Sequence, residues 1–190
     1  MIKDLMKNNK ENEKYLQFFK MGNNSKNFGD KFEKYLISKF GFKEPSKSLD
    51  PNYKFLQYDL WLNGIRIEVK ATRLTEPDKI IPKNSSYLER AAHSESITRN
   101  AGVFAQIKPE ISDIFILAAI FRNTIKYFVV PSNEIETMPG YKKGQHRGTD
   151  LGIGSYRRSA EDWFKKYEAY EDNLISKIKS TYKKIKQIKE

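Results

Sequence analysis

Three charged residues gather around one short turn and could do chemistry together: Asp59, Glu68 and Lys70. The turn is Asn63-Gly64, flanked by alternating apolar residues. This dipeptide predicts a two-residue β-hairpin, because a type I′ turn needs positive φ at both central positions. Counting outward brings Asp59 opposite Glu68, with Lys70 on the same face. Two converging carboxylates are what a hard cation such as Mg²⁺ selects, and the ammonium could assist a reaction beside it.

The elements that must position these residues are the two strands of the hairpin, which have very different faces. One face is apolar and must be buried: Tyr58, Leu60, Leu62, Ile65, Ile67 and Val69. The other is polar: Gln57, Asp59, Trp61, Arg66, Glu68 and Lys70. Directly opposed like charges destabilise a sheet, so Asp59 against Glu68 needs compensation, which Lys70 can give in part. The alternative is a solvated face of mixed charge without chemistry.

An Asp followed by Glu-x-Lys across a hairpin resembles the active-site motif of the PD-(D/E)xK nuclease superfamily, to which many type II restriction endonucleases belong. Tyr58 stands where the family pattern usually has Pro. The resemblance implies that Asp59, Glu68 and the backbone carbonyl of Val69 hold Mg²⁺. It also implies that Lys70 orients or polarises the attacking water.

A helix is predicted from about residue 27 to 40, where Gly41 ends it. Its buried stripe recurs at helical spacing: Phe28, Phe32, Tyr35, Leu36 and Phe40. Glu33 lies beside this stripe. In the superfamily an acidic residue on the helix before the first active-site strand often approaches the metals, so the resemblance makes Glu33 a further catalytic candidate. The alternative is an ordinary surface charge. Another helix is predicted from about residue 2 to 20.

Two apolar runs predict buried strands, one over residues 113–121 and one over 125–130, stopped by Pro131. Before them we expect an exposed loop over 71–86 and helical character over about 86–105. Many restriction endonucleases place a Gln-containing helix and two buried strands after the Glu-x-Lys strand. The segment from Gln106 onward is similar to this order, so the resemblance covers residues 27–135.

The segment 138–158 is rich in Gly, Lys and Arg and is predicted to read DNA. Arg and Gln side chains can bond base edges bidentately. The base-contact candidates are Gln145, His146, Arg147, Arg157 and Arg158, with Arg73, Arg90 and Arg99 as competitors nearer the hairpin. Contact with phosphates or solvent alone is the alternative. A long helix with apolar residues at spacings of three or four is predicted from residue 159 to 190.

The whole chain has 190 residues, no cysteine and a formal net charge of +11. This suits one domain without disulfides or thiolate metal sites, and it favours a polyanionic partner. No apolar run predicts a membrane span or a signal peptide, so we expect a cytoplasmic protein.

We therefore expect a restriction-endonuclease-like α/β domain with a mixed central β-sheet flanked by helices. It would cut double-stranded DNA with Mg²⁺ in a restriction-modification system, without a nucleotide cofactor. A homodimer is expected, because cutting both strands of a symmetric site suits two copies of one active site. Two alternatives stay open: a structure-directed repair or recombination nuclease of the same superfamily, and a non-catalytic DNA-binding protein.

Overall fold

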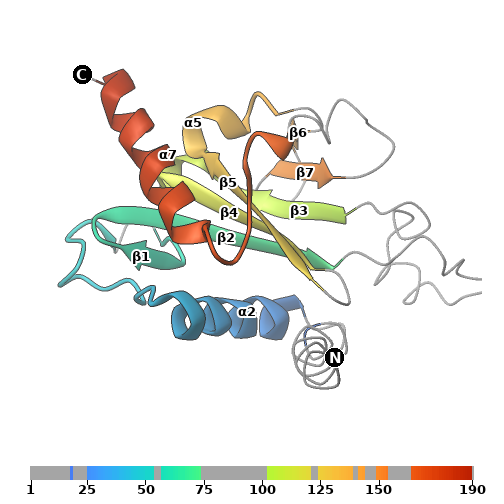
Figure 1. The fold of residues 1–190 in the computed structure, drawn as a ribbon, viewed down its shortest axis with the longest axis horizontal. Coiled ribbons are helices and arrows are strands. Elements are labelled where there is room, and N and C mark those ends of the chain that lie inside the picture. The colour runs from blue at the N-terminus through green and yellow to red at the C-terminus, as the bar shows by residue number, and fades with distance from the viewer. Residues whose placement is uncertain are drawn as a thin grey trace, which may run out of the picture.

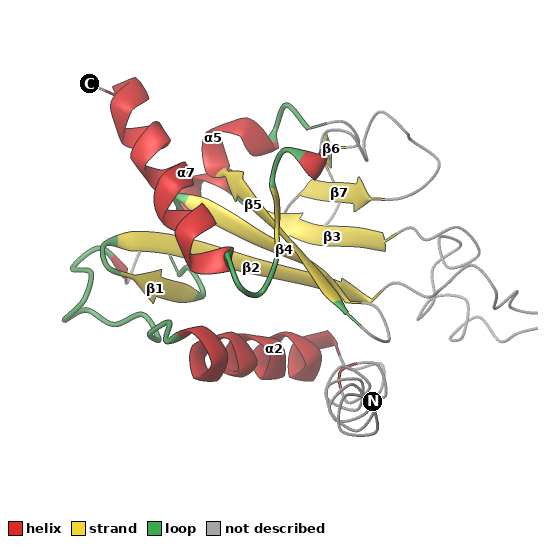
Figure 2. Cartoon of the chain, viewed as in Figure 1, coloured by secondary structure: helices red, strands yellow, loops and turns green. Residues whose placement is uncertain are grey.

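The computed structural model describes residues 18, 25–53, 57–73, 102–120, 124–138, 141–143, 149–153 and 164–189. Within them the chain forms a large sheet, a small sheet and helices packed on the large sheet (Figures 1 and 2). The helices are α2 (Ser25–Phe40), the short α5 (Ser132–Ile135) and α7 (Leu174–Lys189), with a 3₁₀ turn at Pro109–Ile111.

The large sheet contains, in spatial order, β1 (Leu60–Leu62), β2 (Ile65–Arg73), β4 (Ile114–Ile120), β5 (Ile125–Pro131) and β8 (Glu168–Ala169). It is mixed, because β2 and β4 run parallel while the other neighbours are antiparallel. The small sheet is antiparallel, in the order β3 (Gly102–Ile107), β7 (Thr149–Ile153) and β6 (Tyr141–Lys143).

Strand β4 is the centre of the molecule, and all seven of its residues are buried. Alternate side chains enter two different core clusters. Ile114, Ile116, Ala118 and Ile120 pack with residues of α2 and α7. Phe115, Leu117 and Ala119 pack with Phe104 and Ile107 of β3. The two predicted buried strands are thus confirmed as 114–120 and 125–131, with two helices on one face of the sheet and the small sheet on the other. Residue 121 lies outside the described residues, and Pro131, predicted to stop the second strand, is its last residue.

Helix α2 confirms the predicted helix and its end, since Gly41 takes the left-handed backbone with φ of 74°. Phe28, Phe32 and Leu36 are buried in the core, whereas Tyr35 and Phe40 are only partly buried. The predicted helix over residues 2–20 lies outside the described residues apart from Phe18, which packs edge-on against Phe32 at a ring distance of 5.7 Å.

The central hairpin has the predicted register around Asn63-Gly64, and both turn residues have positive φ. The ladder ends at Leu60–Ile67, however, so the predicted Asp59–Glu68 and Tyr58–Val69 pairs are not part of it. The Asp59 amide instead donates to the Ile67 carbonyl at 3.1 Å, because the chain bends one residue before β1. The regular alternation of side chains between the two faces of the hairpin is lost at this bend. Tyr58 is buried as expected, but it stacks on Trp61 of the opposite face.

Three other predictions about the elements were wrong. The segment Gly102–Ile107, expected to be helical up to residue 105 and to place Gln106 in a helix, is strand β3. Its β-branched and aromatic residues complete the second core cluster. Residues 71–73, expected to open an exposed loop, belong to β2 and pair with β4, while the rest of that predicted loop lies outside the described residues.

The C-terminal helix also begins later than predicted, at Leu174 instead of residue 159. Residues Glu168–Ala169 form β8 on the edge of β5, and pairing with that edge outweighs the helical spacing of the aromatic residues. The apolar residues Leu174, Ile178 and Ile185 are buried inside the chain. These three residues of α7 therefore pack within the chain and stabilise its own fold.

The observed class is mixed α/β with a five-stranded mixed sheet, in agreement with the general class expected from the sequence. No helix in the described parts of the chain is long and apolar enough to cross a membrane.

Candidate active site

Asp59 lies at the bend before β1, in the gap where β1 has stopped and β2 continues. Its Oδ2 accepts a hydrogen bond of 2.7 Å from the amide of Val69, which the shortened ladder would otherwise leave without a partner. The bend and the hydrogen bond together hold the carboxylate beside β2. The sequence predicted this residue, but as a regular cross-strand neighbour.

Glu68 and Lys70 project from β2 toward the side of the small sheet, because their neighbours Ile67 and Val69 enter the opposite core cluster. The Lys70 ammonium donates to Glu68 Oε1 at 2.5 Å. Glu68 is only 4% exposed. Its second oxygen, Oε2, is buried and accepts no hydrogen bond. A buried carboxylate oxygen without a donor is costly, so this atom is prepared for a cation or a proton.

The pKa values of Asp59 and Glu68 are both raised. Burial, followed by the neighbouring charge of Asp59, raises the pKa of Glu68 above its ordinary value. Burial also raises the pKa of Asp59, although Lys70 and the Val69 amide act against it. Two carboxylates that cannot both ionise comfortably can share a proton or bind a cation. Lys70 compensates them in part, as the sequence predicted.

Glu33 reaches the same site from α2. Its pKa is raised from 4.5 to about 7, first by burial and then by the charge of Asp59, while Lys70 acts in the opposite direction. These effects place Glu33 within electrostatic range of both hairpin residues. The structure therefore places three of the predicted catalytic residues together on the hairpin, with Glu33 on α2 within electrostatic range of Asp59 and Lys70.

Val69 is the predicted backbone ligand. Its amide points to the β1 side, since it bonds Asp59, and the N–H and C=O of a strand residue point to the same side. The carbonyl thus opens toward the gap beside Asp59. No group of three or more His, Cys, Asp or Glu side chains in the described residues forms a metal site by itself. The residues present fit a hard cation held by two carboxylates, this carbonyl and water.

A second charged cluster, which the sequence did not predict, lies two residues along β2. The Arg66 Nε donates to Asp50 Oδ2 at 2.7 Å, and the Tyr58 hydroxyl donates to the same oxygen at 3.2 Å. The Asn52 amide donates to Asp50 Oδ1 at 2.9 Å. Although burial raises the pKa of Asp50, the bonds from Asn52 and Arg66 lower it overall. This cluster anchors the loop before the hairpin.

The base-contact candidates are not brought together by any described contact. Arg73 is the last residue of β2, and its side chain is not described. The other seven lie outside the described residues: Arg90, Arg99, Gln145, His146, Arg147, Arg157 and Arg158. The DNA-reading segment therefore remains a sequence prediction.

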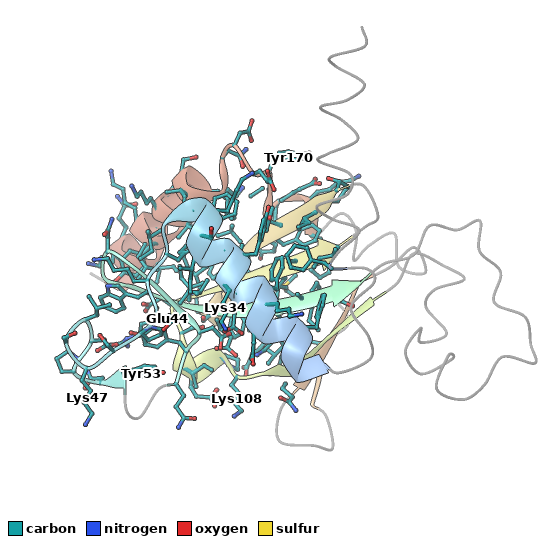
Figure 3. All side chains as sticks on the ribbon, turned by 90° about the horizontal axis from the view of Figure 1, so that it is seen from below. Lys34, Glu44, Lys47, Tyr53, Lys108 and Tyr170 are labelled. Atoms are coloured by element: carbon teal, nitrogen blue, oxygen red, sulfur yellow. The ribbon has the colours of Figure 1, made fainter. Side chains whose placement is uncertain are left out.

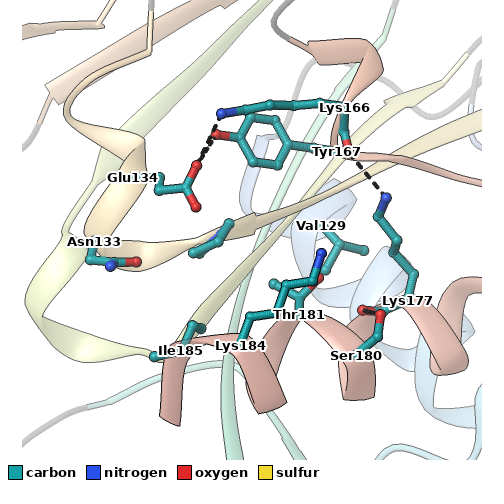
Figure 4. A pocket seen from close by; sticks show the side chains of 11 residues that line it. Val129, Asn133, Glu134, Lys166, Tyr167, Lys177, Ser180, Thr181, Lys184 and Ile185 are labelled. Atoms are coloured by element: carbon teal, nitrogen blue, oxygen red, sulfur yellow. Dashed lines mark hydrogen bonds and ion pairs between the residues drawn. The ribbon is translucent and has the colours of Figure 1, made fainter. Parts of the chain in front are cut away.

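A pocket of about 260 Å³ lies elsewhere, between β5, α5 and α7 (Figure 4). The Glu134 carboxylate accepts bonds from Tyr167 at 2.5 Å and Lys166 at 3.0 Å, and the Lys177 ammonium donates to the Lys166 carbonyl at 3.0 Å. None of the predicted site residues lines it. Two of its lysines, Lys166 and Lys177, bind groups of the chain itself. These contacts hold the segment before β8 against α5 and α7.

Comparison of the chain with protein-family models and with curated proteins gives no match.

Proposed function

We propose that this protein is a Mg²⁺-dependent endonuclease that hydrolyses phosphodiester bonds of double-stranded DNA, acting as a type II enzyme of a restriction-modification system. The observation that carries the proposal is the buried carboxylate pair Asp59 and Glu68, with Lys70 beside it and one Glu68 oxygen left without a donor. A purely structural ion pair would satisfy both oxygens, as Asp50 does.

The chemistry divides among the residues of the site. Asp59, Glu68 and the Val69 carbonyl hold the cation, which when bound supplies Lewis acidity and lowers the pKa of its water. Lys70 orients the attacking water and stabilises charge that develops on the phosphate oxygens. Glu33 supports the site from α2 as an outer carboxylate.

The positive net charge of +11 supports a polyanionic substrate. Lysines on the exposed surface would contact phosphates without reading sequence, so binding should weaken steeply with salt. Base reading is assigned to Arg147, Arg158 and their neighbours on the sequence alone.

A single digest tests the proposal. Supercoiled and linear DNA of diverse sequence is incubated with the purified protein and Mg²⁺, and with EDTA as the control. Discrete fragments with Mg²⁺ alone support a site-specific endonuclease. A smear indicates a nuclease without sequence specificity, and intact DNA over a range of divalent cations contradicts the proposal.

A further inference from the structure

Three aromatic rings form a continuous row beside the hairpin. Tyr53 meets Tyr58 edge-on with ring centroids 5.5 Å apart. Tyr58 in turn stacks nearly parallel on Trp61, at 6.1 Å and an interplanar angle of 28°. The middle ring is buried, while Tyr53 and Trp61 are each partly exposed. The row is thus fixed at its centre and reaches solvent at both ends.

The row is rigid for identifiable reasons. The Tyr58 hydroxyl is held by Asp50, which is itself held by Arg66. Trp61 is fixed through its backbone, because its amide and carbonyl both pair with Lys43, at 2.9 and 3.0 Å. An aromatic surface that is already ordered loses little conformational entropy when a ligand stacks on it.

Trp61 also lies on the same side of the hairpin as the carboxylates. It alternates with Leu60 and Leu62, which are buried in the core on the opposite face. Its cross-strand partner Arg66 precedes Glu68 by two residues on the same face of β2, a spacing of roughly 7 Å along the strand. A nucleic-acid strand with one phosphate at the carboxylate pair would therefore carry a neighbouring nucleotide past Trp61.

The charges around the row suit a polyanion. Lys43 and Lys47 have exposed side chains in the segment that borders it, and Figure 3 shows Lys47 and Tyr53 near one another at the same end of the molecule. Glu44 is exposed in the same segment and offsets one of these two positive charges.

We infer that Trp61, backed by Tyr58 and Tyr53, is a stacking surface for an unpaired nucleobase adjacent to the phosphate that is cut. This inference rests on the proposed nuclease function and makes it more specific. The favoured substrate is double-stranded DNA with a base unpaired next to the cut, at a strand end, a mismatch or a locally opened step. Stacking tolerates any base, because every base offers a π face.

Fluorescence gives a direct test, since the chain has two tryptophans, Trp61 and Trp163. In a Trp163→Phe protein the emission comes from Trp61 alone. A single-stranded oligodeoxyadenosine is titrated in EDTA, where metal-dependent cleavage cannot occur, alongside a perfect blunt duplex and the same duplex with a central mismatch bubble. We expect quenching by the single strand and the bubble, and little by the perfect duplex.

Variants separate stacking from folding. Trp61→Ala should weaken binding of the single strand roughly 5- to 100-fold, while Trp61→Phe keeps most of the affinity. Tyr170→Ala is the matched control, because Tyr170 is 55% exposed and lies outside the row. Thermal unfolding of each variant checks that the fold is intact. If Trp61→Ala does not fold, the quenching result in the Trp163→Phe protein decides alone.

Two results would overturn the inference: unchanged Trp61 emission with every oligonucleotide, or equal weakening by Tyr170→Ala and Trp61→Ala. Cleavage of DNA without quenching would remove the inference and keep the nuclease. Quenching by single strands without cleavage under any divalent cation would remove the nuclease and keep Trp61 as a binding surface for nucleic acid.

Discussion

One hairpin carries two charged clusters, and they are built in opposite ways. Around Arg66, both oxygens of Asp50 receive hydrogen bonds and its carboxyl has a lowered pKa. Around Lys70, the carboxyls of Glu33, Asp59 and Glu68 all have raised pKa values, and one oxygen of Glu68 accepts no bond. The first cluster is complete within the chain. The second leaves one carboxylate oxygen without a donor, which is what we expect of a site that binds a cation.

The largest effect is expected from substitutions in the second cluster, the one around Lys70. Glu68→Gln or Asp59→Asn should lower Mg²⁺-dependent cleavage by roughly a thousandfold or more, since each removes a cation ligand. Initial rates on plasmid DNA measure this. Asp50→Asn, assayed well below its unfolding temperature, serves as the control and should keep most of the activity. Full activity in Glu68→Gln would mean that the second cluster is only structural.

The next largest effect is expected from a substitution in the first cluster, the one around Arg66. Asp50→Asn should lower the free energy of unfolding by about 2–3 kcal/mol, because Arg66 and Tyr58 lose a charged acceptor. Urea denaturation of the metal-free protein at pH 7.5 measures it. A loss no larger than that of an exposed substitution such as Asp172→Asn would show that the Arg66 cluster adds little to stability.

A smaller effect is expected at the edge of the second cluster. Glu33→Gln should slow cleavage about tenfold, because an outer carboxylate adjusts the site without being its main ligand. The dependence of the rate on Mg²⁺ concentration separates weaker cation binding from slower chemistry. Asp172→Asn is the control, because Asp172 is exposed and does not act on Glu33. A loss as large as that of Glu68→Gln would instead make Glu33 a direct ligand.

The smallest effect concerns pH. Folding raises the pKa of Glu33 from 4.5 to about 7 and also raises those of Glu68 and Asp59. The folded protein therefore holds these protons more tightly than the unfolded chain does. The stability that they contribute is present below about pH 4 and is lost as pH rises through about 7. Asp50 acts oppositely, because its pKa is lowered. Its ionised carboxylate stabilises the fold, and this stability is lost only when more acidic solution protonates it.

The metal-free protein should accordingly be less stable at pH 8 than at pH 5.5, by on the order of 1 kcal/mol. Urea denaturation in EDTA at both values measures the difference. Glu68→Gln should reduce the dependence, and Mg²⁺ should restore stability at pH 8 by binding the folded state. Equal stability of the wild-type protein at both pH values would contradict the raised pKa values.

How much of this could be predicted from the sequence differs between the local and the long-range parts of the site. The Asn63-Gly64 turn, the hairpin register and the helix ended by Gly41 follow from neighbouring residues, and all three were predicted. The choice of Asp59, Glu68, Lys70 and Glu33 also came from spacing and motif. These features depend on backbone preference and on period-2 or period-3.6 alternation, which the chain carries locally.

Other features depend on partners far away in the chain. Residues 102–107 became a strand because they pair with Thr149–Ile153 and pack on β4, and residues 168–169 did so because β5 offered a free edge. The bend at Asp59 and the pairing of Asp50 with Arg66 likewise had no local signal. The sequence by itself determined which groups could do the chemistry. Only the tertiary structure decided which carboxylates are satisfied and which are not, because burial and hydrogen-bond partners are properties of the assembled core.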